Sequence, residues 1–214
     1  MADFFQPPRY IAVEGPIRVG KSTLARILAG KMQARLLLEP ESNPHLDAFY
    51  AAQPGAALRA QMYFLYQRYQ QLAPLGVRPR EPVVTDYLFE KDKLFACINL
   101  NDSELSVYNA YYEMFRPQIG APDLVIYLQA SVDVLRRRLG KRNLASERSL
   151  SPAYLEEVAA AYKHFFYHYS QSDLLVIDTS EIDFVERNED LQELLRRLSE
   201  PIQGTQYFLP LGAG

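Results

Sequence analysis

The chain has 214 residues, of which 48% are hydrophobic and 23% are charged. This length suits a single compact domain with one core, and the composition is that of a globular protein. The formal net charge of −3 argues against a protein that coats polymeric nucleic acid, because that function needs a broad surplus of Lys and Arg. The single cysteine, Cys97, excludes an internal disulfide and a cysteine-rich metal site.

The start of the chain and its hydropathy pattern predict where the protein works. The first ten residues, MADFFQPPRY, lack the basic and apolar regions of a secretory signal. No apolar run approaches the roughly 18 residues that a membrane span requires. We therefore expect a cytoplasmic protein with no membrane partner.

Short apolar runs predict buried β-strands, and segments with apolar residues three and four apart predict helices between them. Each run is continuous rather than alternating, as expected for a parallel sheet whose two faces are both covered. The expected strands are residues 10–14, 35–39, 82–86, 124–129 and 174–178. The expected helices are residues 21–32, 58–72, 88–98, 103–115, 132–139 and 152–169.

This alternation predicts one three-layer α/β domain over residues 1–200, with a five-stranded parallel sheet flanked by helices. A ligand site is expected beyond the carboxyl ends of the strands. The last stretch, residues 201–214, follows the final helix without periodicity. We expect it to be an extended or disordered tail.

A glycine-rich loop follows the first expected strand and opens the first expected helix. Residues 15–22, GPIRVGKS, fit the pattern G-x-x-x-x-G-K-[ST], in which backbone N–H groups surround a phosphate at a helix N-terminus. Lys21 adds charge to the β- and γ-phosphates, and the Ser22 hydroxyl can bind Mg²⁺. The loop predicts a P-loop NTPase fold that holds a nucleotide. The expected nucleotide-binding residues are Gly15, Pro16, Ile17, Arg18, Val19, Gly20, Lys21, Ser22 and Thr23.

Carboxylates after the second and third expected strands favour a small-molecule kinase. A switch GTPase is unlikely because the chain lacks D-x-x-G and N-K-x-D. Glu39, fixed by Pro40, can take a proton from an acceptor hydroxyl; a solvated strand end is the alternative. Asp86 is the candidate second ligand of Mg²⁺ beside Ser22, and an ordinary helix cap is its alternative.

Two polar residues share one side of the expected helix 58–72. Gln61 and Arg68 are seven residues apart, which places them two helical turns from each other. An amide and a guanidinium can together read the polar edge of a nucleobase. The alternative is the solvated face of the helix.

Up to about residue 200, the chain resembles the deoxynucleoside kinase family, including its short bacterial members. The motifs that carry this resemblance are the phosphate loop, the pair Glu39-Pro40, and the spacing of Tyr50, Gln61 and Arg68. The resemblance implies that Glu39 is the general base on the sugar 5′-hydroxyl and that the enzyme is a homodimer. It also implies the substrate-binding residues, which are Tyr50, Gln61, Arg68, Asp92, Phe95 and Glu147.

Arginines crowd the segment after the fourth expected strand, between Arg136 and Arg148. The resemblance implies an arginine-rich lid here, with Arg138 and Arg142 matching lid arginines and Glu147 at the sugar 3′-hydroxyl. A solvated helix face is the alternative. The resemblance also places Asp183 and Phe184 in the loop that borders the donor adenine.

Two positions depart from the family pattern. In the family an arginine follows the acidic residue that matches Asp86, but Tyr87 stands there in this chain. Leu144 stands where the lid has another arginine. The cation that supports the general base and the phosphates is therefore open, with Arg18, Arg142 and Arg148 as candidates.

We expect an enzyme of nucleotide salvage that transfers the γ-phosphoryl group of ATP, with Mg²⁺, to the 5′-hydroxyl of a deoxynucleoside. The expected catalytic residues are Lys21, Glu39 and Arg142, and a purine or deoxycytidine is favoured over thymidine. The alternatives are a nucleoside monophosphate kinase, and a regulatory module that binds nucleotide but has lost catalysis.

Overall fold

The computed structural model describes residues 8–40, 42–142 and 151–210. Within these ranges a single parallel sheet of six strands has the order β2-β3-β1-β4-β5-β6. The expected α/β architecture is confirmed, but the sheet has one strand more than the five that we expected. The strands are β1 (Tyr10–Glu14), β2 (Arg35–Leu37), β3 (Val83–Thr85), β4 (Leu124–Gln129), β5 (Asp173–Asp178) and β6 (Thr205–Phe208).

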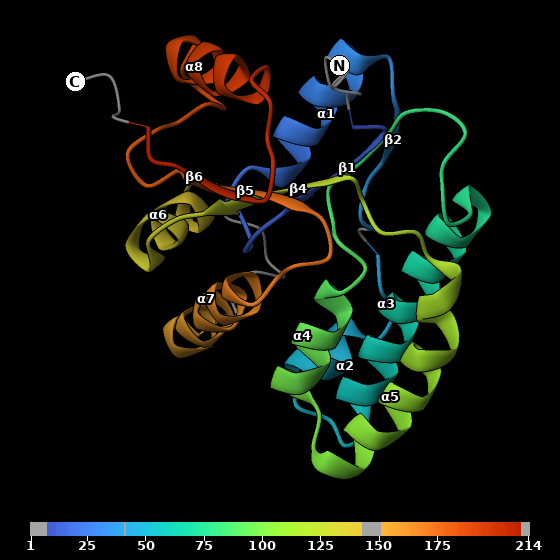
Figure 1. The fold of residues 1–214 in the computed structure, drawn as a ribbon. Helices are drawn as coiled ribbons and strands as arrows, with labels where there is room; N and C mark the ends of the chain where they lie inside the picture. Colours follow the sequence, from blue (N-terminus) through green and yellow to red (C-terminus); the bar gives the residue numbers. More distant parts are fainter. Residues whose placement is uncertain (1–7, 41, 143–150, 211–214) are drawn as a thin grey trace.

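Helices cover both faces of the sheet (Figure 1). One face is covered by α1 and α8, and the other by α3, α4, α5 and α7. The helices are α1 (Lys21–Met32), α2 (Leu46–Tyr50), α3 (Ala56–Leu72), α4 (Lys91–Asn99), α5 (Asp102–Phe115), α6 (Val132–Arg142), α7 (Pro152–Tyr167) and α8 (Asn188–Leu198). Two short 3₁₀ turns, η1 (Ala73–Leu75) and η2 (Arg116–Gln118), follow α3 and α5.

Continuous apolar strands supply both cores, because successive side chains of a strand point to opposite faces. In β1, Tyr10 and Ala12 belong to the core beneath α3, α4, α5 and α7, whereas Ile11 and Val13 belong to the core beneath α1 and α8. The same alternation holds in β4 and β5. The apolar runs that form β1, β4 and β5 are therefore buried strands inside the sheet, whereas the run at residues 35–39 forms the edge strand β2.

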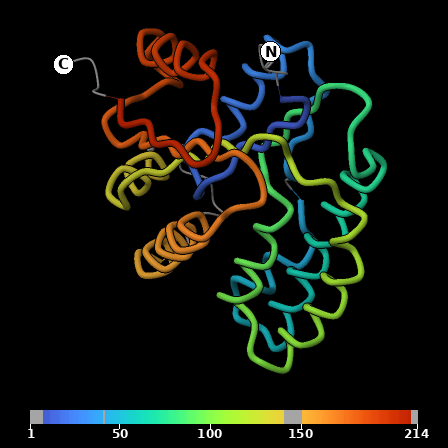
Figure 2. Tube along the Cα trace, in the orientation of Figure 1, coloured from blue at the N-terminus to red at the C-terminus, as the bar shows by residue number. Residues whose placement is uncertain are grey.

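The sixth strand comes from the segment that we expected to be an extended or disordered tail. Residues Thr205–Phe208 pair with β5 in parallel, with Leu174 opposite Thr205 and Ile177 opposite Phe208. The segment is thus extended, as one of the two expected alternatives, but it joins the sheet instead of forming a free tail. Its place in the sheet was not predicted because β6 lies at the edge, where alternate residues remain exposed. Figure 2 shows the chain returning from α8 to this edge before its C-terminal end.

The topology brings the candidate site residues to one end of the sheet. The carboxyl ends of β1, β2 and β3 lie side by side, because β3 pairs with both β1 and β2 in parallel. Glu14 ends β1, while Glu39 and Asp86 follow β2 and β3 closely. Across the described residues we find no helix with the length and apolar character needed to cross a bilayer.

Candidate active site

The phosphate loop joins β1 to α1 and contains two glycines that no other residue could replace without strain. Gly15 has φ 151° and Gly20 has φ 109°. A Cβ atom at Gly15 would lie 2.2 Å from the carbonyl oxygen of Leu128, and one at Gly20 would lie 2.5 Å from Cζ of Phe184. The tight packing leaves the loop backbone as the surface that a phosphate would contact.

A cavity of about 460 Å³ adjoins this loop. A volume of this size falls within the range of small-molecule sites. Its lining residues are Arg18, Val19, Gly20, Lys21, Ser22, Thr23, Arg138, Asp183, Phe184, Val185 and Glu186. The lining thus contains the residues that we expected to bind the donor nucleotide, apart from Gly15, Pro16 and Ile17. The presence of Arg18 in the lining favours a contact with phosphate over a purely solvent-facing side chain.

Lys21 folds back over the phosphate loop. Its Nζ donates hydrogen bonds to the carbonyl oxygens of Gly15 at 2.8 Å and Pro16 at 3.1 Å. Burial lowers the pKa of Lys21 to about 8, and the neighbouring positive charge of Lys91 adds to this shift. The carboxylates of Glu14, Glu39 and Asp86 oppose this shift, and a bound phosphate would add further negative charge beside the ammonium group.

Asp86 connects the phosphate loop to Glu39. Its Oδ2 accepts a hydrogen bond from the Ser22 hydroxyl at 2.5 Å, and its Oδ1 accepts one from the backbone N–H of Glu39 at 2.6 Å. Helix α4 begins only at Lys91 with Glu90 at its N-cap, so the interpretation of Asp86 as a helix cap is wrong. Adjacent hydroxyl and carboxylate oxygens are ligands that suit Mg²⁺.

The carboxylate of Glu39 lies between two cations. Lys91 donates a hydrogen bond from Nζ to Oε2 at 2.8 Å, and Arg68 donates one from Nη2 to Oε1. Burial alone would raise the pKa of Glu39, but Lys91, Arg68 and Lys21 outweigh burial and hold this pKa well below its usual range. Glu39 is therefore ionised, as a group that accepts a proton must be.

Arg68 also pairs with a second buried carboxylate. Its Nη1 lies 2.6 Å from Oδ2 of Asp92, and both side chains are almost fully buried. Burial raises the pKa of Asp92, although the charge of Arg68 opposes the shift. Among the described residues, Nε of Arg68 and Oδ1 of Asp92 have no hydrogen-bond partner. These two buried atoms therefore remain able to bind a further polar group or a water molecule.

Three other expected substrate residues lie on different helices and differ in how deeply they are buried. Gln61 is buried on α3, the helix that also carries Arg68. The ring of Phe95 lies 5.5 Å from Nζ of Lys91, which connects it to the surroundings of Glu39. Tyr50 ends α2, packs beside Phe49 and is partly exposed.

Glu14 anchors the inner side of the site. Its Oε1 accepts hydrogen bonds from the backbone N–H of Gly15 at 2.8 Å and from the Tyr162 hydroxyl at 2.9 Å. Its Oε2 accepts a hydrogen bond from the backbone N–H of Leu88 at 2.8 Å. These bonds tie the end of β1 and the first residue of the phosphate loop to α7 and to the segment before α4.

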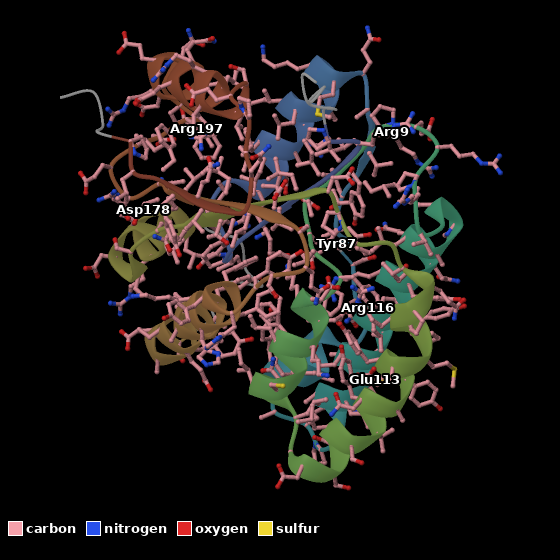
Figure 3. All side chains as sticks on the ribbon, in the orientation of Figure 1. Arg9, Tyr87, Glu113, Arg116, Asp178 and Arg197 are labelled. Carbon is pink, nitrogen blue, oxygen red and sulfur yellow. The ribbon has the colours of Figure 1, made fainter. Side chains whose placement is uncertain are left out.

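Tyr87, at the position of the missing family arginine, does not supply a cation but braces the neighbouring elements. Its hydroxyl donates to Oε1 of Gln71 at 2.6 Å, and its carbonyl oxygen accepts from the Thr85 hydroxyl at 2.7 Å. Figure 3 labels Tyr87 between the sheet and the helices below it.

The arginines of α6 divide between solvent and structure. Arg136 and Arg137 are exposed, as the interpretation of a solvated helix face requires. Arg138 instead donates three hydrogen bonds to the segment after β5, to the Thr179 hydroxyl and to the carbonyl oxygens of Thr179 and Ile182. Glu147, Arg148, Leu144 and the side chain of Arg142 lie outside the described residues.

Two site residues escaped the sequence analysis. Lys91 contacts Glu39 directly, and Tyr162 donates a hydrogen bond to the buried Glu14. The available signal for Lys91 was its place directly before Asp92, an expected substrate residue. The sequence had suggested Arg18, Arg142 or Arg148 as the cation that supports the general base. In the structure, Lys91 and Arg68 contact Glu39.

The family model for deoxynucleoside kinase matches residues 11–203, nearly the whole chain. The chain belongs to the deoxynucleoside kinase family. This deoxynucleoside kinase is 31% identical to the deoxyguanosine kinase of Bacillus subtilis (strain 168) over 90% of its own length and 97% of that relative. It is 24% identical to the deoxyadenosine/deoxycytidine kinase of the same organism, over 92% of its own length and 94% of that relative.

The fold also matches solved structures of this family. A structure of M. mycoides deoxyadenosine kinase, with dCMP and dCDP bound, superimposes with a TM-score of 0.75 at 23% identity. The match covers 88% of the present chain and 98% of the other. The family match, together with the relative at 31% identity, makes the protein a deoxynucleoside kinase, which is a phosphotransferase.

Proposed function

We propose that this kinase transfers the γ-phosphoryl group of ATP to the 5′-hydroxyl of a deoxynucleoside, with Glu39 as the general base. Glu39 would take the hydroxyl proton while the hydroxyl oxygen bonds to the γ-phosphorus and the bond to ADP breaks. The observation that carries this proposal is the short connection from the phosphate loop to Glu39, through Ser22 and Asp86.

The chain's own residues would perform the remaining tasks by position and charge. The loop backbone between Gly15 and Ser22 would hold the phosphates, with Lys21 as a point charge. The oxygens of Ser22 and Asp86 would hold Mg²⁺, which when bound neutralises charge on the phosphates. Phe184 and Asp183 line the same cavity and would border the donor base.

For the acceptor, we propose that Gln61, Arg68 and Asp92 read the nucleobase. This set offers donors and acceptors in a buried place, which suits the polar edges of purines and cytosine better than that of thymine. The names of the relatives support the same preference for purines and cytosine, because the relative at 31% identity is a deoxyguanosine kinase and the one at 24% is a deoxyadenosine/deoxycytidine kinase.

A panel of acceptors tests the proposal. The full chain is incubated with ATP and Mg²⁺ and one of deoxyguanosine, deoxyadenosine, deoxycytidine, thymidine, dGMP, AMP or dTMP, and ADP release is measured. We expect turnover with the purine deoxynucleosides and deoxycytidine, with deoxyguanosine first, and a 5′-monophosphate as the product. Turnover with monophosphates alone, or ATP binding without ADP release for every acceptor, would contradict it.

We further propose that the enzyme is a homodimer that pairs through α5. Three large apolar side chains of this helix, Val107, Tyr111 and Met114, are exposed at helical spacings of four and three residues. An apolar stripe of this kind on a described surface helix suits an interface of two identical copies.

A further inference from the structure

Two cations contact the carboxylate of Glu39, but they come from different elements and have different second partners. Arg68, on α3, divides its guanidinium between Glu39 and Asp92. Lys91, at the start of α4, lies between Glu39 and Glu14. The second partner of Arg68, Asp92, belongs to the proposed base-reading set. The second partner of Lys91, Glu14, ends β1 directly before the phosphate loop.

The second partner of Lys91 is rigidly held. The Nζ of Lys91 lies 3.9 Å from Oε1 of Glu14. The Glu14 side chain is fully buried, and its two carboxylate oxygens accept three hydrogen bonds, from Gly15, Leu88 and Tyr162. A carboxylate bonded in this way cannot rotate without breaking several bonds at once. Through Glu14, the position of the Lys91 side chain is therefore fixed relative to the end of β1 and the first residue of the phosphate loop.

The side chain of Lys91 has little freedom of its own. Only 7% of it is exposed, and its ammonium lies 5.5 Å from the centre of the Phe95 ring. Burial by itself would lower the pKa of Lys91, but Glu14 and Glu39 outweigh burial and raise this pKa. The group is a fixed positive charge 2.8 Å from Oε2 of Glu39.

We propose that Lys91 is a positioning residue of the transfer reaction, which holds the Glu39 carboxylate in register with the phosphate loop. The inference rests on the proposed role of Glu39 as the general base. A bound nucleobase would draw Arg68 toward its own edge, and Lys91 would then keep Glu39 charged and oriented.

Substitution of Lys91 tests the role. Lys91→Met keeps the length of the apolar stem and removes the charge, so we expect kcat to fall on the order of 10²-fold. The KM for the deoxynucleoside that the acceptor panel ranks first should change by less than about threefold, since Lys91 does not belong to the base-reading set. Lys91→Arg restores a cation, and we expect it to recover at least about tenfold of the lost kcat.

A matched control lies two residues away on the same helix. Lys93 is 45% exposed and its side chain pairs with Glu113 at 3.4 Å; Figure 3 labels Glu113 on α5. Lys93→Met makes the same chemical change on the surface of α4. It should leave kcat and KM at their wild-type values.

A double-mutant cycle separates positioning from an independent effect. If Lys91 acts through Glu39, Lys91→Met should have no further effect on kcat in a chain that already carries Glu39→Gln. Multiplied losses in the double variant, or a Lys91→Met variant with the kcat of Lys93→Met, would overturn the proposal. Melting temperatures of all variants show that they fold, and Lys91→Gln takes the place of Lys91→Met in the cycle if the latter does not.

The same variants also distinguish a failure of the proposed role of Lys91 from a failure of the proposed general base. Glu39→Gln alone with near wild-type kcat would remove the proposed general base, whatever Lys91 does. An inactive Glu39→Gln together with a fully active Lys91→Met would leave the base in place and remove the role of Lys91.

Discussion

The backbone of Gly15 in the phosphate loop is constrained both by its conformation and by its surroundings. Its φ of 151° lies outside the range that L-residues adopt readily, and the carbonyl oxygen of Leu128 occupies the place of a side chain. The close approach locks the loop onto the end of β4. The position therefore contributes to both the stability and the function of the loop.

Replacing Gly15 by alanine should damage both. We expect Gly15→Ala to lower the free energy of unfolding by about 1–3 kcal/mol, from backbone strain and the clash with Leu128, and to weaken ATP binding. Urea unfolding and calorimetric titration with ATP would measure the two effects. Gly30 is the matched control, because a Cβ there meets nothing within 4 Å inside helix α1. Gly30→Ala should stabilise the chain by up to about 1 kcal/mol, and a loss at Gly30 as large as at Gly15 would contradict the argument.

At the same scale, Lys91 and Lys93 show what a sequence leaves undecided. Both lysines lie in the same polar-apolar pattern, yet the first is buried beside Glu39 and the second is exposed. Two residues two positions apart point to opposite sides of a helix, and the pattern does not say which side faces the site. Glu39 and Asp86 were predictable because they follow strands, whose carboxyl ends meet at one edge of a parallel sheet.

At the scale of the elements, α5 begins with a sequence motif that is typical of a helix N-terminus. The Asn101 side chain accepts a hydrogen bond from the backbone N–H of Glu104 at 3.0 Å. The Glu104 side chain accepts one in return from the backbone N–H of Asn101 at 3.3 Å. This capping box satisfies two backbone donors that the first turn would otherwise leave unpaired.

Removing the cap should cost stability without affecting the reaction. We expect Asn101→Ala to lower the free energy of unfolding by about 1 kcal/mol, because the N–H of Glu104 loses its partner. Asn101→Asp keeps an acceptor oxygen and should be within a few tenths of a kcal/mol of wild type. Chemical denaturation measures both, and kcat should stay unchanged in each. An equal loss in the two variants would mean that the cap contributes nothing.

The elements also differ in how far their sequence foretold them. The strands β1, β4 and β5 lie near the centre of the sheet and were predicted to within a residue, since both of their faces need apolar side chains. The edge strand β6 has exposed Thr205 and Tyr207 and thus lacks a continuous apolar run. Helix α2 spans one turn, which is too short for a periodicity to emerge from residues 46–50.

On the scale of the whole molecule, buried tyrosines make the fold sensitive to alkali. Burial is the main cause that raises the pKa of eight tyrosines, in the case of Tyr169 to about 12. These tyrosines are Tyr10, Tyr87, Tyr108, Tyr112, Tyr127, Tyr154, Tyr162 and Tyr169. Their phenols stay protonated in the native chain at a pH where the unfolded chain has begun to ionise.

The free energy of unfolding should therefore fall steeply above pH 10. Since the folded pKa values are raised, this contribution is complete below the unfolded value near 10 and is lost as the pH rises. Each tyrosine that cannot ionise contributes about 1.4 kcal/mol of loss per pH unit. Urea unfolding between pH 9 and 11.5 measures the slope, and the part of the tyrosinate absorbance that comes from the buried tyrosines should rise together with unfolding. Ionisation of all the tyrosines in a chain that remains folded would contradict the assignment.

The proposed dimer is tested at this scale as well. Met114 is 61% exposed in the apolar stripe of α5, so Met114→Glu should place a charge in the interface and yield monomers. Size-exclusion chromatography with light scattering measures the mass. Tyr167→Glu is the control, because Tyr167 is 77% exposed on α7 and lies outside the stripe. A wild-type chain that is monomeric at micromolar concentration, or a Met114→Glu dimer, would rule out this interface.

Asp86 receives hydrogen bonds from both halves of the site, from Ser22 on the donor side and from Glu39 on the acceptor side. In the proposed reaction, three adjacent strand ends would set the distance that the phosphoryl group crosses, while α3 and α4 would carry the residues proposed to read the nucleobase. The same two helices also carry Arg68 and Lys91, which contact Glu39. A substitution on them can therefore exchange one acceptor for another without altering the transfer step only where it spares these two side chains.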